Sequence, residues 1–451
     1  MPARAGERPP ILSRTHRLID HTGGTMALLI VVFILALTIG VPVFIALAGS
    51  SLLYTHFIGN IPDFVVLHRM AGGIDSFPLL AVPFFILAGN LMNSAGITNR
   101  IYDFAVALCG WMKGGLAHVN IVGSVIFSGM SGTAIADAAG LGTIEIKAMK
   151  DHGYSTEFAV GVTAASATLG PIIPPSLPFV IYGMMANVSI GALFMGGIIP
   201  GLFMTVTMML YVAYYAHRHG IGRDQMFRWR VLGTSFISAF PALLTPVIII
   251  GGMTLGWFTP TEAAVAACAW ALFLGVFLYR SLSLKQFYKV TLDTIETTAA
   301  VLLIVAGASL FAWVLTVTHI TEYTTQGLLT LSDNPYVILL IINLILLAVG
   351  CFLETIAAIS ILVPVLLPVI VKVGIDPIHF GLVMTLNLMI GLLHPPLGMV
   401  LFVLARISKL SIEQTTMAIL PWLLPLLVSL AAITIFPELT LWLPRLAGLL
   451  N

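Results

Sequence analysis

The chain has 451 residues, of which 59% are hydrophobic and only 9% are charged. This composition excludes a soluble globular domain and is typical of a membrane protein with many spans. Twenty lysines and arginines nearly balance nineteen acidic residues, so the sequence indicates no nucleic-acid partner. The three cysteines lie far apart in apolar sequence, which indicates buried small side chains rather than a metal site or a disulfide framework.

The first elements in chain order are apolar runs that contain prolines. Residues 1–25 are rich in arginine and carry no long apolar run, so we expect an N-terminal extension there. Apolar runs at 26–58 and 77–93 follow, and each is a candidate membrane segment. The segment 98–113 is amphipathic and is expected to lie at the membrane interface.

Residues 116–150 consist of two half-length apolar arms around a small polar tip that runs from Ser128 to Thr133. Irregular backbone at membrane depth survives only where protein or water surrounds it. The pattern therefore predicts a re-entrant hairpin rather than one continuous span.

Two proline pairs interrupt otherwise apolar runs. Pro174 and Pro175 lie within 158–186, and Pro395 and Pro396 lie 221 positions later. Neither pair can continue a helix, because each ring removes a donor and clashes with the preceding turn. The same offset relates other helix-breaking residues, namely Gly129 with Gly350, Gly153 with Gly374, and Pro200 with Pro421. Paired broken spans of this kind indicate the binding region of a secondary transporter.

Two loops are rich in basic residues. The loop 217–230 has four arginines against one aspartate, and 280–289 has three basic residues and no acid. The positive-inside rule predicts that both are cytoplasmic. The spans expected at about 235–256 and 260–279 lie between these loops and would form an out-and-back pair.

The second half is expected to mirror the first as an inverted-topology repeat. Its expected elements are apolar runs at 297–319 and 335–349, a hairpin at 350–373, a broken run at 378–405, and one or two final spans at 417–447. Trp422 and Trp442 are the candidate interface anchors of these last spans.

Hydroxyls and freed carbonyls at the tips and breaks suit a hard cation that has no carboxylate cage. The alternative is that these small residues only let helices pack closely. Ionisable residues at membrane depth are functional candidates because burying them is costly. Asp137 and Glu354 stand beside the tips and rank first, whereas Glu145, Glu296 and Glu322 are expected at interfaces.

Two further residues near the second break leave alternatives open. Arg406 either faces an anionic substrate or extends to the membrane interface. For His394, a hydrogen-bonded structural role is favoured over a titrating one.

From Met26 onward the chain resembles the large membrane subunit of tripartite ATP-independent periplasmic (TRAP) transporters, the DctM-like or SiaM-like subunit. The motifs that carry this resemblance are Gly40-Val41-Pro42, Ser128-Gly129-Met130-Ser131-Gly132-Thr133, Ile173-Pro174-Pro175-Ser176, Gly374-Ile375-Asp376-Pro377 and Pro395-Pro396-Leu397-Gly398. Each motif alone is weak, and together they are specific. Two departures are His394, where the family usually has threonine, and residues 1–25, which have no counterpart in the typical unfused subunit.

The resemblance implies an all-α polytopic membrane protein with the elevator fold of the ion-transporter superfamily, built from two inverted repeats with re-entrant hairpins and broken helices. The implied divisions are the extension 1–25, scaffold helices 26–115, the first transport-domain repeat 116–200, scaffold and connecting helices 201–336, the second repeat 337–421, and a C-terminal span 422–451.

The resemblance further implies sodium-coupled transport of an organic-acid anion across the bacterial inner membrane. It implies two partners, a small four-span DctQ/SiaQ-like subunit and a periplasmic DctP/SiaP-like binding protein, and it leaves open whether the substrate is a dicarboxylate, a sialic acid or another carboxylate. The implied sodium ligands are Ser128, Ser131, Gly132, Thr133, Ser166 and Gly170 at one site, and Gly350, Thr355, Asn387 and Gly391 at the other. The residues expected near the substrate are Pro174, Pro175, Pro395, Pro396 and Arg406.

Two other functions compete with this one. Gly129-Met130-Ser131-Gly132 fits the Gly-x-Ser-Gly pattern of intramembrane serine proteases, but the position 221 residues after Ser131 is Phe352. A duplicated feature without a second nucleophile favours architecture over catalysis, so we expect no enzyme. A channel is the third possibility and would need no binding protein.

Overall fold

The computed structural model of the chain describes residues 28–57, 61–395 and 398–450. Within these ranges the regular structure is helical, apart from one isolated bridge between Lys113 and Arg223. Seven described helical segments are long and apolar enough to cross a membrane, which confirms the expected all-helical membrane protein. The extension at 1–25 and Pro396 lie outside the described residues.

The described part of the apolar run expected at 26–58 contains two helices, which are separated at Gly40-Val41-Pro42. A first helix covers 28–38, and Gly40 then adopts a left-handed φ of +82° before α2 (Val43–Phe57) begins after Pro42. The amphipathic helix α3 (Asp63–Ile74) follows and was not expected from the sequence, because it is short and interrupted by two glycines.

The next segments form the first hairpin and the first broken helix. In order they are η1 (Phe77–Leu80), α4 (Ala81–Ser94), α5 (Ile97–Cys109), α6 (Gly115–Ser131), α7 (Ala134–Asp151), α8 (Thr156–Ala167) and α9 (Leu177–Ala186). Arms α6 and α7 pack against each other across a two-residue tip, as the re-entrant pattern predicts.

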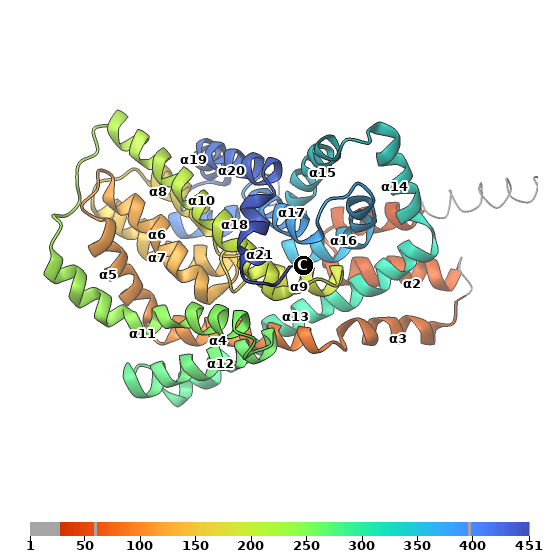
Figure 1. Cartoon of the computed structure of the whole chain (residues 1–451), viewed down its shortest axis with the longest axis horizontal. Helices are drawn as coiled ribbons and strands as arrows, with labels where there is room; N and C mark the ends of the chain where they lie inside the picture. Colours follow the sequence, from red (N-terminus) through yellow and green to blue (C-terminus); the bar gives the residue numbers. More distant parts are fainter. Residues whose placement is uncertain (1–27, 58–60, 396–397, 451) are drawn as a thin grey trace, which may run out of the picture.

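Long helices connect the two halves. They are α10 (Ile190–Arg218), α11 (Trp229–Thr254), α12 (Pro260–Phe273) with a π-helical turn at Leu274–Leu278, α13 (Leu284–Val317) and the shorter α14 (Ile320–Leu331). Helix α13 packs against α2, α3 and α4, and α12 packs against α4. In Figure 1, α3, α4, α11, α12 and α13 lie along one side of the molecule.

The second half repeats the helix boundaries of the first. Its elements are α15 (Pro335–Gly350), α16 (Thr355–Lys372), α17 (Pro377–Gly391), α18 (Met399–Ser408), α19 (Ile412–Ile419), η3 (Leu420–Trp422), α20 (Leu423–Ile435) and α21 (Glu438–Leu446). Helices α16 and α17 begin 221 positions after α7 and α8. The hairpin expected at 350–373 needs correction: that range holds only the tip and the second arm, and the first arm is α15. The inverted relation of the two copies stays a prediction.

The helix after each break ends in the same kind of corner. Asn187 has φ +54° and Ser189 caps α10, while Lys409 has φ +63° and Ser411 caps α19. The packing is also reciprocal, because α7 packs on α18 and α16 packs on α9. The hairpins and broken helices therefore make one interlocked unit (Figure 1).

Trp422 is not the interface anchor that the sequence suggested. Its side chain is only 2% exposed and lies 4.9 Å from the Tyr211 ring and 5.6 Å from the Phe158 ring, centroid to centroid. A Cβ at Gly161 would lie 2.5 Å from the indole, so glycine makes room for it. Trp442 is 54% exposed, as an anchor requires.

Candidate functional site

The first hairpin tip lies directly against the first break. Gly132 ends α6 with φ +63°, and a Cβ there would lie 2.9 Å from the Pro175 carbonyl oxygen. The Leu177 amide donates to the Gly132 carbonyl at 3.4 Å. A Cβ at Gly170 would lie 3.1 Å from the Thr133 carbonyl oxygen, so only a very small residue fits on either side. The structure thus brings Gly132, Thr133 and Gly170 together.

Three hydroxyls near this contact keep acceptor capacity. Ser128 donates to the Val125 carbonyl at 2.6 Å, and Ser166 donates to Oδ1 of Asn120 at 2.6 Å. A hydroxyl that donates its proton still has oxygen lone pairs for a cation. Thr133 caps α7 by accepting from the Ala136 amide at 3.3 Å. Ser131 is the last residue of α6.

The second tip meets the second break through two glycines. A Cβ at Gly391 would lie 2.6 Å from the Cα of Gly350, and one at Gly350 would lie 3.0 Å from the Cα of Gly391. Helices α15 and α17 therefore end backbone against backbone. The last four carbonyls of a helix have no partner within it, so two converging C-termini offer oxygens at one place.

Side-chain oxygens without a partner lie close in sequence to these glycines. Oγ1 of Thr355, Oγ1 of Thr385 and Oδ1 of Asn387 are buried and have no hydrogen-bond partner among the described residues. The Asn387 amide nitrogen donates to the main-chain and side-chain oxygens of Asn343 at 3.0 and 2.9 Å. This pair of bonds fixes the amide and leaves its oxygen available. Neutral oxygens of this kind fit a sodium ion, a hard cation that prefers oxygen ligands.

The structure adds two residues that the sequence analysis missed. Asn120 on α6 holds Ser166, and Asn343 on α15 holds Asn387, so each first hairpin arm orients the polar residue before the break. Asn343 also donates to Thr434 on α20 at 3.1 Å. A single asparagine within the otherwise apolar run of α15 was the available signal, since such residues seldom occur in lipid-facing helices.

The structure places one of the acidic residues, Glu145, differently from the expectation. Glu145 is not at an interface: it is 2% exposed, and a Cβ at Gly123 would lie 2.9 Å from its Oε1. Glu296 and Glu322 are exposed, and their place at a membrane interface stays a prediction. Glu354 caps α16 by accepting from the amides of Ile356 and Ala357 at 3.0 and 3.2 Å.

The expected substrate residues are not gathered in one described cavity. Pro174 and Pro175 are buried at the first break, whereas Pro395 is exposed. Arg406 is exposed on the last turn of α18, about 10 Å along the helix axis from Met399 at its start. His394 has its Nδ1 3.0 Å from the Ile390 carbonyl, which fits the hydrogen-bonded histidine favoured from the sequence.

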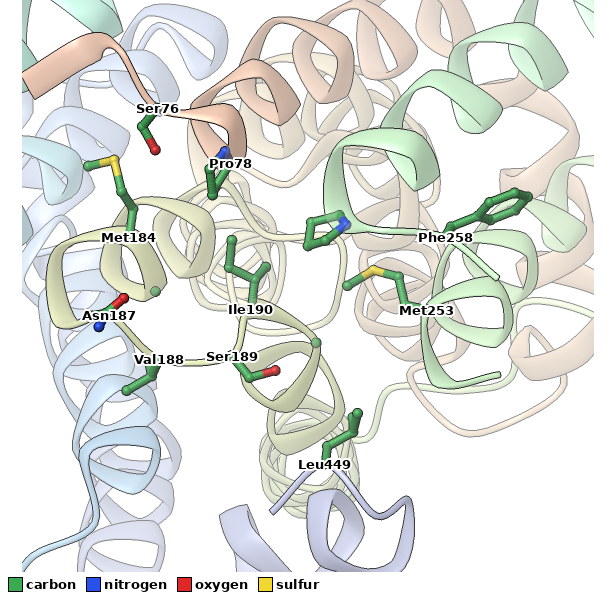
Figure 2. Close-up of a pocket in the computed structure, with 13 residues that line it drawn as sticks. Ser76, Pro78, Met184, Asn187, Val188, Ser189, Ile190, Met253, Phe258 and Leu449 are labelled. Carbon is green, nitrogen blue, oxygen red and sulfur yellow. The ribbon is translucent and has the colours of Figure 1, made fainter. Parts of the chain in front are cut away.

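A cavity of about 580 Å³ lies at the corner between α9 and α10 (Figure 2). Met184 on α9, Ile190 on α10 and Met253 on α11 surround it, and Leu449 closes one edge. The lining is mostly apolar and includes none of the expected sodium or substrate residues.

The comparisons with known proteins agree with one another on the family. A family model described as "Tripartite ATP-independent periplasmic transporter, DctM component" matches residues 30–439. The sialic acid TRAP transporter large permease protein SiaM of Vibrio cholerae is 47% identical over 407 residues, which cover 90% of this chain and 95% of the relative. The C4-dicarboxylate TRAP transporter large permease protein DctM of Rhodobacter capsulatus is 33% identical over 438 residues, 94% of this chain and 100% of the relative.

Solved structures of other transporters share the fold. The Alcanivorax borkumensis YdaH transporter superposes with a TM-score of 0.62 at 13% identity, covering 83% of this chain and 87% of that one. At such low identity the match supports the architecture alone.

Proposed function

Because the chain belongs to the DctM family of TRAP transporter large permeases, we propose that it imports an organic-acid anion together with sodium ions. Membership of this family makes the chain a multi-pass membrane transporter and rules out the intramembrane serine protease considered for Ser131. The inner membrane of a bacterium is the proposed location, with the basic loops 217–230 and 280–289 on the cytoplasmic face.

One observation carries the sodium proposal. Three buried oxygens, on Thr355, Thr385 and Asn387, have no partner among the described residues, and they lie within six positions of the Gly350–Gly391 contact. Leaving buried acceptors unsatisfied costs about 1–3 kcal/mol each, so a ligand that engages them is favoured. We place one sodium ion here and a second at the Gly132–Gly170 contact, where Ser128 and Ser166 keep acceptor lone pairs.

The anion is proposed to bind beside the two sodium sites, at the N-termini of the helices that follow the breaks. The first turn of α18 has no side-chain cap, so its amides offer donors to a carboxylate, whereas the first amides of α9 already donate to Gly132 and Ser176. The dipoles of both helices favour negative charge at these N-termini. The higher identity to the sialic acid permease favours a sugar acid as the first substrate to test.

The moving unit is proposed to be the two hairpins with the broken helices, α6–α9 and α15–α18. Their reciprocal packing supports rigid-body motion against the remaining helices, as an elevator requires. A small four-span subunit and a periplasmic binding protein complete the proposed system, and the binding protein delivers the substrate.

Uptake into proteoliposomes that contain both membrane subunits tests the proposal. With the binding protein and labelled sialic acid or a C4-dicarboxylate outside, uptake is expected only when an inward sodium gradient is present. Uptake that is unchanged when choline replaces sodium would remove the coupling. Uptake that persists without any binding protein would remove the proposed delivery step.

A further inference from the structure

A second cavity, of about 450 Å³, opens on the face that carries the basic loop 217–230. It lies between the α7–α8 turn, residues 152–155, and the end of α10 with the loop after it, residues 219–224. The first segment belongs to the proposed moving unit, and the second leads away from it towards α11. The cavity contains none of the proposed sodium or substrate residues.

Three basic side chains line this cavity: His152, His219 and Arg223. Nδ1 of His152 lies 2.8 Å from the Ala148 carbonyl, and Nδ1 of His219 lies 3.0 Å from the Tyr215 carbonyl. A carbonyl can only accept, so each Nδ1 holds the proton and each ring is fixed in orientation. The three groups come from both segments. Arg223 supplies a fixed positive charge, and Nε2 of each ring is the nitrogen left free, which donates to an anion when the ring carries its second proton.

The acid in the cavity is already engaged. Oδ2 of Asp224 accepts from the Tyr154 hydroxyl at 2.7 Å and from the Leu116 amide, at the start of α6, at 2.9 Å. Burial and the hydrogen bond to Asp224 raise the pKa of the Tyr154 phenol, which therefore stays protonated and donates. Because two donors neutralise much of its field, Asp224 opposes an incoming anion less than an unpaired carboxylate would.

One wall of the cavity is aromatic. The Tyr215 ring is stacked on Phe158 at 4.1 Å and on His219 at 3.9 Å, centroid to centroid. Flat apolar faces beside basic groups suit a small molecule with a carbon skeleton better than a bare inorganic ion.

We propose that this cavity binds a small carboxylate anion from the cytoplasm and that its occupancy slows import. The inference rests on the proposed function, since the imported organic acid is released on this face and accumulates there. A carboxylate that contacts His152 together with His219 and Arg223 bridges the hairpin base to the α10–α11 loop. The bound carboxylate is then a second link between the two segments, beside the Tyr154–Asp224 hydrogen bond. By binding to both segments it favours one arrangement of them over others.

The test uses proteoliposomes with both membrane subunits, with the binding protein added only outside so that only correctly oriented molecules are measured. The lumen is loaded with a sugar acid, a C4-dicarboxylate, inorganic phosphate or chloride at equal ionic strength. Initial sodium-driven uptake is compared for the wild type, for the triple variant H152Q/H219Q/R223Q, and for H217Q/R218Q. The last variant removes two neighbouring basic groups that do not line the cavity.

Luminal carboxylate is expected to lower uptake about tenfold in the wild type and in H217Q/R218Q, and less than about twofold in the triple variant. Equal uptake by all three proteins with an empty lumen shows that they are folded and active. Equal inhibition of the triple variant would overturn the site, as would inhibition by chloride or by phosphate alone. Absence of sodium-driven uptake in every protein would instead contradict the proposed function.

Discussion

Gly350 and Gly391 lie backbone against backbone, and a Cβ on Gly391 would lie 2.6 Å from the Gly350 Cα. The contact joins the end of α15 to the end of α17 without a side chain between them. Forcing a methyl group into this space must separate the two helix ends by part of an ångström or more, and the oxygens around them would move with them.

Gly391→Ala is therefore expected to reduce sodium-driven uptake by at least about tenfold, because overpacking costs about 1–3 kcal/mol and displaces the ion ligands. The measurement is initial uptake at saturating substrate in proteoliposomes. Gly327→Ala is the matched control, since Gly327 is helical, has open space around it and gains helix propensity on substitution. Equal activity of the two variants would show that the tip and the break need not touch.

Asn387→Ala is expected to raise the sodium concentration that gives half-maximal uptake, because it removes the unpartnered Oδ1. Asn343→Ala keeps that oxygen but removes the side-chain acceptor that orients it, so a smaller shift in the same direction is expected. Sodium titrations of uptake at fixed substrate separate the two effects.

Asn90→Ala controls for the loss of a partly buried asparagine elsewhere. Asn90 donates to Thr294 at 3.1 Å on the side of the molecule built from α4 and α13. The sodium dependence of this variant should match the wild type even if its expression falls. A similar shift in all three variants would mean that general stability, and not ion binding, explains the effect.

The two tryptophans of the C-terminal segment should behave differently. Trp422→Ala is expected to destabilise the protein by about 3–5 kcal/mol, because it empties a buried aromatic site beside Phe158 and Tyr211. Trp442→Ala removes a side chain that is 54% exposed and should cost much less. Thermal denaturation in one detergent compares them, and equal losses would contradict the buried placement of Trp422.

Trp422 also shows where reasoning from the sequence fails. Composition, proline pairs and the 221-residue offset were enough to predict a helical membrane protein, the first hairpin and both breaks. A tryptophan near the end of an apolar span predicts an interface anchor. Only the packing of Trp422 against Gly161 shows that its side chain belongs to the core. The short helix α3 was missed for a related reason, since twelve amphipathic residues with two glycines resemble a loop.

The candidate site was predictable in outline. Helix-breaking residues mark a tip and a break in each half, and the structure places Gly132 beside Gly170 and Gly350 beside Gly391. The orienting partners Asn120 and Asn343 were not foreseen, because the register between an arm and a broken helix depends on packing that no spacing rule specifies. Glu145 was misplaced for the same reason.

Tyr154→Phe is expected to lower stability by about 1 kcal/mol, because Asp224 then accepts from the Leu116 amide alone. The raised pKa of the phenol gives the sign of any pH effect. The stabilisation is complete below about pH 10, which is the ordinary pKa of a tyrosine in the unfolded chain. It is lost only as the pH rises through the higher pKa that Tyr154 has in the folded protein. Stability measured at pH 7 and pH 9 should therefore show the same difference between wild type and variant.

Tyr214→Phe is the matched control, since the Tyr214 hydroxyl only accepts from an exposed Arg218 at 3.1 Å. It should change stability by less than about 0.5 kcal/mol. A larger loss in Tyr214→Phe than in Tyr154→Phe would show that the Asp224 contact does not hold the base of the hairpin.

Sodium binding to the purified complex of both membrane subunits tests the central claim most directly. Titration calorimetry in a choline buffer should give a saturable heat with sodium and none with potassium, and Asn387→Ala should weaken the sodium affinity while Asn90→Ala leaves it unchanged. The same heat with potassium, or an unchanged sodium affinity in Asn387→Ala, would contradict a sodium site at the contact between the second tip and the second break.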